Sequence, residues 1–142
     1  MKYKTITFSF SKPATKEQEL ILIGFFQGIR DHVKKKLKKA INAMRGPIQR
    51  KLGGPQTEAI MLRMQNAYDQ LKEFLVLNKI DERTYLFKVA HEDLQPYNTK
   101  GLPFMDKLDF WPRLKGRVLQ MKKEIIKEMG LLDSELTVTA ED

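Results

Sequence analysis

A run of cationic side chains between residues 30 and 51 is the part of this sequence best suited to chemistry. The segment RDHVKKKLKKAINAMRGPIQRK carries nine Lys or Arg and one acid, Asp31, for a net charge of +8. The whole chain also has a net charge of +8, so the residues outside the segment balance at 17 basic and 17 acidic. Neighbouring like charges on a helix repel by roughly 0.2–0.5 kcal/mol per pair. We therefore expect a polyanion that relieves this repulsion, and nucleic acid is the commonest polyanion in a reducing compartment.

A second basic region, residues 100–123, is interleaved with aromatic residues and holds seven basic and two acidic side chains. Basic side chains can hold a phosphate backbone while exposed rings stack on unpaired bases. Tyr97 and Trp111 are the candidates for stacking, because their polar atoms suit a wet interface. Phe104 and Phe110 are expected to be buried instead, since large apolar rings mostly are.

The two regions together predict a non-catalytic nucleic-acid-binding protein of low sequence specificity. RNA or single-stranded DNA is slightly favoured over duplex, because the candidate stacking residues fall in a loop. The predicted contact residues are Arg30, Lys34, Lys35, Lys36, Lys38, Lys39, Arg45, Arg50, Lys51, Tyr97, Lys100, Trp111, Arg113, Lys115 and Arg117.

Residues that could catalyse a reaction are sparse. His32 and His91 have no partner at a spacing suited to nucleophilic catalysis or to zinc. The group His91-Glu92-Asp93, or Asp106 with Asp109, could bind Mg²⁺ for phosphodiester hydrolysis if a third ligand came from elsewhere. Short acidic groups of this kind are common on solvated surfaces, so a nuclease ranks third, behind nucleic-acid binding and an interaction module. We predict no enzyme activity, no cofactor and no metal site.

Composition restricts the compartment and the kind of partner. The chain has no cysteine, which suits a reducing, cytoplasmic location. Its longest apolar run, LILIGFF at residues 20–26, is far shorter than the ~20 residues that a membrane-spanning helix needs. The N-terminal segment alternates where a signal peptide would have a continuous apolar centre. We therefore expect an intracellular protein that does not bind membranes.

The N-terminal third is predicted to be a strand followed by a long helix. Residues 3–10 alternate with period two and are rich in β-forming residues, as in a strand. Thr15 with Gln18 matches a capping box, and apolar residues then recur every three or four positions. The predicted helix runs over residues 15–45 and ends at Gly46-Pro47, because proline disrupts a helix interior.

Further along the chain, the apolar spacing predicts a helix over residues 57–78 capped by Thr57 and a last helix over residues 112–129 that ends at Gly130. Residues 81–94 are ambiguous between helix and strand. We favour a short helix there, with Asp81 as its cap. Residues 95–111 are predicted to be a loop, and residues 135–140 a strand.

These elements predict a single, mainly α domain (α+β) over residues 1–142. It consists of about four helices with a two-stranded β-ribbon formed by the N- and C-terminal segments, since an isolated ribbon is marginal unless it packs on something. The LILIGFF segment is apolar nearly all round its helix. It therefore supports an alternative function: a protein–protein interaction or assembly module that uses the lysine face and forms a homo-oligomer through Leu20–Phe26.

Overall fold

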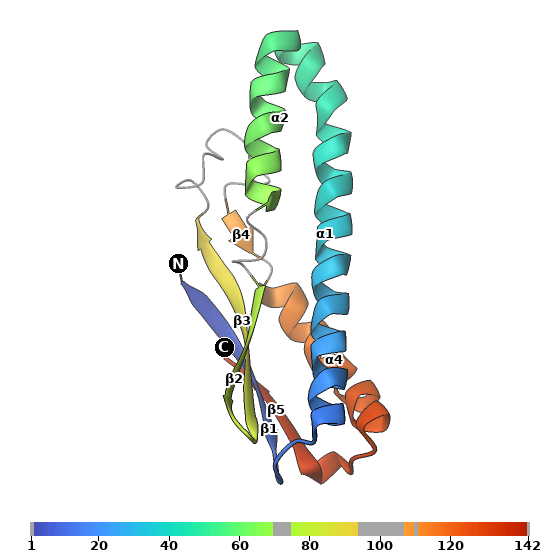
Figure 1. Cartoon of the computed structure of the whole chain (residues 1–142). Helices are drawn as coiled ribbons and strands as arrows, with labels where there is room; N and C mark the ends of the chain where they lie inside the picture. The colour runs from blue at the N-terminus through green and yellow to red at the C-terminus, as the bar shows by residue number, and fades with distance from the viewer. Residues whose placement is uncertain (1, 70–74, 94–106, 110, 142) are drawn as a thin grey trace.

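The computed structural model has an α+β fold in which helices pack on one face of an antiparallel sheet (Figure 1). It describes residues 2–69, 75–93, 107–109 and 111–141. Over these ranges the elements, in chain order, are β1 (Tyr3–Phe10), α1 (Lys16–Leu52), α2 (Gly54–Asp69), β2 (Leu75–Asp81), β3 (Thr84–Asp93), β4 (Lys107–Asp109), α4 (Trp111–Met129), a 3-10 turn (Asp133–Glu135) and β5 (Leu136–Ala140).

The sheet has the strand order β2-β3-β1-β5, with β4 paired to the far end of β3. The predicted pairing of the N- and C-terminal strands is confirmed, since β1 and β5 run antiparallel with Phe8 opposite Val138. The prediction of a two-stranded ribbon is wrong, however, because β1 also pairs with β3. The termini therefore contribute two strands of a larger sheet, and the predicted bundle of four helices is replaced by three described helices.

Residues 81–94 were expected to form a short helix, and the structure corrects this expectation. Thr84–Asp93 is the strand β3, which buries Tyr85, Phe87 and Val89 on one face. Asp81 caps a turn rather than a helix, since its Oδ1 accepts a hydrogen bond from the backbone N–H of Arg83 at 2.8 Å. Because an aspartate satisfies backbone donors in the same way at helix starts and in tight turns, local sequence did not separate the two.

The helix predicted over residues 57–78 is also wrong in extent. Within the described residues helix α2 spans Gly54–Asp69, and Leu75–Asp81 is a strand paired with β3. Thr57 is not the cap but an interior residue of α2 that is 1% exposed, and its hydroxyl donates to the Gly53 carbonyl at 2.7 Å. A short apolar run such as LVL fits either period, so its pairing partner decides its conformation.

Helix α1 continues past Gly46-Pro47 to Leu52, so the predicted stop is wrong. Gly46 has no Cβ to clash with the proline ring, which removes one of the two contacts that exclude a helical residue before proline. Pro47 also deprives the Ala43 carbonyl of its donor, but both residues are exposed and water can supply the bond. The helix ends instead at Gly53, whose φ of 80° favours glycine.

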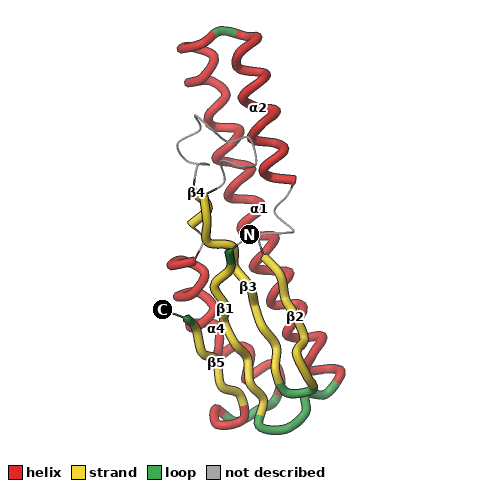
Figure 2. The backbone as a smooth tube through the Cα atoms, turned by 90° about the vertical axis from the view of Figure 1, so that its left-hand side faces the viewer, coloured by secondary structure: helices red, strands yellow, loops and turns green. Residues whose placement is uncertain are grey.

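The molecule has two parts, which we name the head and the helical hairpin. In the head, the N-terminal half of α1 and helix α4 lie on one face of the sheet (Figures 1 and 2). In the helical hairpin, the C-terminal half of α1 runs antiparallel to α2 and projects beyond the sheet (Figure 2). Helix α1 has 37 residues and is about 55 Å long at 1.5 Å per residue, so it belongs to both parts.

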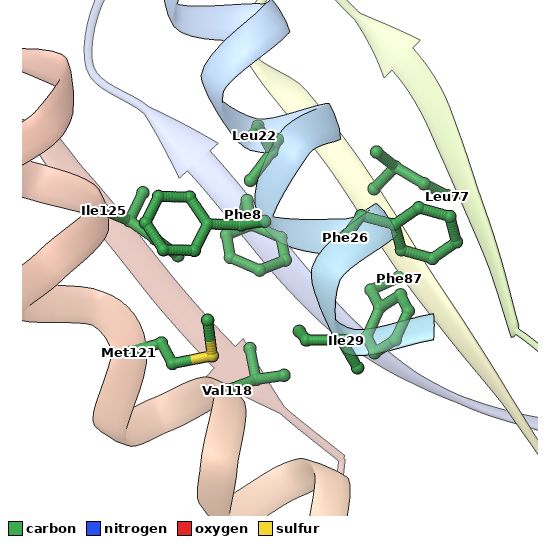
Figure 3. Close-up of a pocket in the computed structure, with 10 residues that line it drawn as sticks. Phe8, Leu22, Phe26, Ile29, Leu77, Phe87, Val118, Met121 and Ile125 are labelled. Atoms are coloured by element: carbon green, nitrogen blue, oxygen red, sulfur yellow. The ribbon is translucent and has the colours of Figure 1, made fainter. Parts of the chain in front are cut away.

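The core of the head lies between the sheet and the two helices that cover it. Phe8 and Phe87 from the sheet meet Leu22 and Phe26 from α1, and α4 closes the side (Figure 3). Their side chains leave a cavity of about 20 Å³, which is large enough for a single water. Because its lining is apolar, a water there would find no hydrogen-bond partner, and the cavity is expected to be dry.

Two side-chain hydrogen bonds to Glu19 of α1 join this helix to strands β2 and β3, from Lys79 and Tyr85 respectively. The Tyr85 hydroxyl donates to Glu19 Oε2 at 2.6 Å, and the Lys79 ammonium donates to the same oxygen at 2.9 Å. These two hydrogen bonds hold the pKa of Glu19 below its ordinary value. Burial, together with the bond to Glu19, raises the pKa of Tyr85.

The Tyr85→Phe variant is expected to lose about 1 kcal/mol of unfolding free energy at neutral pH, because one partly buried hydrogen bond disappears. Since the pKa of Glu19 is depressed on folding, its contribution is present above the unfolded pKa and is lost as pH falls through the folded one. The variant should therefore lose less stability than the parent protein on acidification. Urea unfolding at about pH 7 and about pH 3 measures both quantities, and equal acid sensitivity of the two proteins would contradict the prediction.

Candidate nucleic-acid interface

The lysine run lies on α1 where the helix leaves the head and enters the helical hairpin. Val33 and Ile41 are 9% and 4% exposed and form the inward stripe of this segment. At 100° per residue, Lys34 lies at the edge of that stripe and the other four lysines between them point away from it. Lys34 is half-buried, whereas the others are exposed: Lys35, Lys36, Lys38 and Lys39. The division into one core side and one cationic side that the spacing predicted is confirmed.

The helical hairpin holds most of the excess charge of the chain. Residues 34–69 contain nine basic and two acidic side chains, a net of +7, against +8 for the whole protein. The acidic residues of the C-terminal segment, including Glu128, Asp133 and Glu135, lie on the head. The charge is therefore separated along the molecule, with the positive end on the projecting element.

Carboxylates of the same chain neutralise little of this charge. Among the described residues, Arg45 is the one member of the 30–51 run that forms an ion pair, with Glu58 of α2. Both side chains are at least half exposed, and exposed pairs contribute about 0–1 kcal/mol, so a phosphate could compete for Arg45. Lys34, Lys35 and the three lysines that follow them have no ion pair within the described ranges.

Arg50 and Lys51 are exposed in the last turn of α1. The Arg50 Nε donates to the Gly46 carbonyl at 3.4 Å. Cations at this end of a helix interact favourably with the unpaired carbonyls and the helix dipole. Both side chains therefore have a structural role in addition to the predicted contact with phosphate.

His32 lies within the positive charge of the candidate interface, although the sequence analysis did not assign it there. Burial lowers the pKa of His32, and the charges of Arg117, Lys36 and Lys35 lower it further. Arg117 comes from α4, so the fold brings one residue of the second basic region beside the first. His32 precedes Lys35 and Lys36 by one helical turn, a spacing that could have indicated its position in the cationic field.

Arg30 has a structural role in addition to its predicted contact with phosphate. Its guanidinium donates to the Leu75 carbonyl at 2.5 Å and lies 4.6 Å from the centre of the Phe26 ring. These contacts fasten α1 to the start of β2. The contact of Arg30 with phosphate stays a prediction, since these contacts use only part of its guanidinium.

Trp111 does not stack on bases in this fold, so that prediction is wrong. Its side chain is 4% exposed and belongs to the core of the head. The Lys4 and Lys115 ammonium groups lie 5.9 Å and 6.0 Å from the centre of its ring. A wet interface was expected for the indole, but burial of its large apolar area has the larger effect. Lys115 is half-buried beside it.

The remaining predicted contact residues are only partly placed. The loop predicted over residues 95–111 lies outside the described residues, except for Lys107–Asp109 and Trp111. The part outside includes Tyr97, Lys100 and Phe104. Arg113 lies in the first turns of α4, and its side chain is not among those described.

The pairing of β3 with β4 concerns the residues of the alternative magnesium site. The antiparallel pairing of β3 with β4 sets His91 opposite Asp109, so the fold brings together two groups that are 18 positions apart in the chain. Sequence reasoning treated these groups as separate because it did not foresee the pairing. Within the described residues, however, no cluster of three or more His, Asp or Glu could hold a metal ion.

Comparisons of the chain with protein-family models, curated proteins and solved structures find no match. The assignment of function therefore rests on the geometry above. In the described part of the chain, none of the helices has both the length and the apolar character needed to cross a bilayer.

Proposed function

We propose that this protein binds nucleic acid without catalysis, through phosphate contacts on the lysine face of the helical hairpin. The observation that supports this most strongly is the set of exposed lysines on a projecting helix with no ion pairs among the described residues. Retained repulsion at neighbouring helical positions is relieved when a polyanion binds and its counterions are released.

The shape of the hairpin supports binding to the backbone rather than reading of bases. Lys35, Lys38 and Lys39 lie on adjacent turns of α1, each 5.4 Å long, and Arg50 follows about 16 Å farther along the helix. They can therefore follow a strand of phosphates. Lysine is a flexible point charge, and phosphate contacts carry no sequence information. We therefore propose low sequence specificity. The preference for single strands rested on Tyr97 and Trp111, and the burial of Trp111 leaves phosphate contact as the proposed basis of affinity.

Affinity for nucleic acid is expected to fall steeply as salt rises. With about five lysine–phosphate contacts, the logarithm of the affinity should fall against the logarithm of salt with a slope of about −4.5 for duplex DNA and about −3.5 for single strands. The affinity should then drop roughly 10²- to 10³-fold between 50 and 200 mM salt. Fluorescence anisotropy with labelled single-stranded RNA, single-stranded DNA and duplex DNA measures this slope. Binding that is indifferent to salt would contradict the proposal.

The alternative of an assembly module gains support from what the fold leaves exposed in the LILIGFF segment. Leu22 is buried in the core, and Ile21, Phe25 and Phe26 are partly buried against the head. Leu20 is 59% exposed and Gly24 is exposed, so this face of α1 is available to a partner.

A further inference from the structure

A groove runs between α1 and α4 on the outside of the head. Its volume is about 530 Å³, far larger than the core cavity, and it opens to solvent. Apolar side chains of both helices form its floor. The lining residues are Ile21, Gly24, Phe25, Gly28 and Ile29 of α1 with Arg117, Met121 and Glu128 of α4.

Two glycines on the α1 side of the groove have no explanation within one copy of the chain. Gly24 and Gly28 are one helical turn apart and exposed, and a Cβ added at either would meet nothing within 4 Å. Glycine inside a helix is about 1 kcal/mol less favourable than alanine. No packing contact of the described head requires that loss. A bare helix backbone does, however, allow a second helix to approach closely.

The two charged residues of the groove lie at its opposite ends. Helix α4 runs back along α1, so that the Met129 carbonyl at its C-terminus accepts a hydrogen bond from Gln18 near the start of α1. Arg117 and Glu128 are 11 positions apart, which is about 16 Å along α4. Both side chains are exposed, and within the described residues neither forms an ion pair.

We propose that two copies of this chain associate through this groove about a two-fold axis. A two-fold axis across the middle of the groove exchanges its ends, so Arg117 of each copy lies beside Glu128 of the other, and two ion pairs form. The glycines let the α1 helices cross closely and cover Ile21, Phe25 and Met121 of both copies. Self-complementary surfaces of this kind are the usual basis of homodimers.

This dimer is a separate proposal from the binding of nucleic acid, and the two surfaces meet at Arg117, which lines the groove and is also a predicted contact residue. The axis sets the two α1 helices antiparallel, so the helical hairpins project from opposite ends of the dimer. The lysines from Lys34 to Lys39 follow the groove along α1, where Arg117 lies beside the first basic region. Because dimerisation is measured without nucleic acid, failure of one proposal is distinguished from failure of the other.

Sedimentation velocity of the full chain without nucleic acid tests the proposal, with a dimer expected at tens of micromolar protein. Gly28→Leu fills the close approach and should give a monomer. Gly116→Leu is the matched control, since Gly116 is an exposed glycine of α4 outside the groove with nothing within 4 Å of an added Cβ. That variant should remain dimeric. A parent protein that is monomeric at about 100 μM, or a dimer that survives Gly28→Leu, would overturn the proposal.

A charge exchange tests the two-fold arrangement itself. Arg117→Glu or Glu128→Arg alone places like charges together twice per dimer, and each should weaken dimerisation by at least about tenfold, since like-charge contacts across an interface are unfavourable. The double variant restores opposite charges at both contacts and should recover the dimer. Circular dichroism confirms that each variant is folded. Failure of the double variant to recover would overturn the proposed pairing of Arg117 with Glu128.

Discussion

Changing Lys34, Lys35, Lys38 and Lys39 together to Glu is expected to abolish nucleic-acid binding. The substitution alters the net charge of the helical hairpin, residues 34–69, from +7 to −1. Phosphates would then meet repulsion where they now meet attraction, and the counterion release that supplies the affinity would be lost. Anisotropy titrations at about 50 mM salt should show a loss of more than roughly 10³-fold.

The matched control reverses four lysines of the head: Lys12, Lys16, Lys123 and Lys127. All four are exposed, and the variant has the same total charge as the hairpin variant. It should keep most of the affinity at moderate salt, because charges more than a Debye length of about 8–10 Å from the bound strand are screened. Equal losses in the two variants would show that total charge matters and the lysine face does not. Unchanged binding by the hairpin variant would reject the proposed function.

The Phe87→Ala variant is expected to lose about 3–5 kcal/mol of unfolding free energy. Phe87 is 2% exposed in the middle of the sheet, opposite Ile6 of β1 and Leu77 of β2. Its ring meets that of Phe26 edge to face, with 5.1 Å between centroids. The contact joins the sheet to α1, and the existing cavity beside it would enlarge when the ring is removed (Figure 3). Small domains have only 5–15 kcal/mol in total, so the loss is large.

Urea denaturation followed by far-ultraviolet circular dichroism measures this loss. Leu119→Ala is the control on α4, because Leu119 is 40% exposed and its truncation should change stability by about 0.5 kcal/mol or less. A loss below about 1 kcal/mol for Phe87→Ala would contradict the packing of α1 on this face of the sheet.

The elements that sequence predicted correctly are those whose signals are local. The alternation of Ile6, Phe8 and Phe10 specified β1, and all three side chains are buried on one face. The capping box is present in both halves: Thr15 Oγ1 accepts from the Gln18 N–H at 3.1 Å, and Gln18 Oε1 accepts from the Thr15 N–H at 3.0 Å. Helix α4 ends at Gly130 with a φ of 68°, as its sequence predicted.

The predictions that were wrong concern segments whose local sequence is compatible with two backbone conformations. Pro47 predicts the end of a helix by local sequence. Helix α1 continues through it because Gly46 precedes the proline and the surrounding residues are exposed. Leu75–Asp81 and Thr84–Asp93 could be helix or strand by pattern, and they became strands because β1 offers an edge with which β3 pairs. Such long-range pairing is invisible to a window of neighbouring residues.

The candidate site divides in the same way. Charge is a property of composition, so the sequence alone determined that residues 30–51 are the cationic centre and that Val33 and Ile41 face inward. Whether an individual side chain is free depends on what the fold packs against it. Tertiary structure engaged Arg30 with Leu75 and buried Trp111, and it brought Arg117 beside His32. It also placed the lysines on the helical hairpin, apart from the acidic residues of the head. Burial and proximity are set by contacts between segments distant in the chain, so a local reading of the sequence does not determine them.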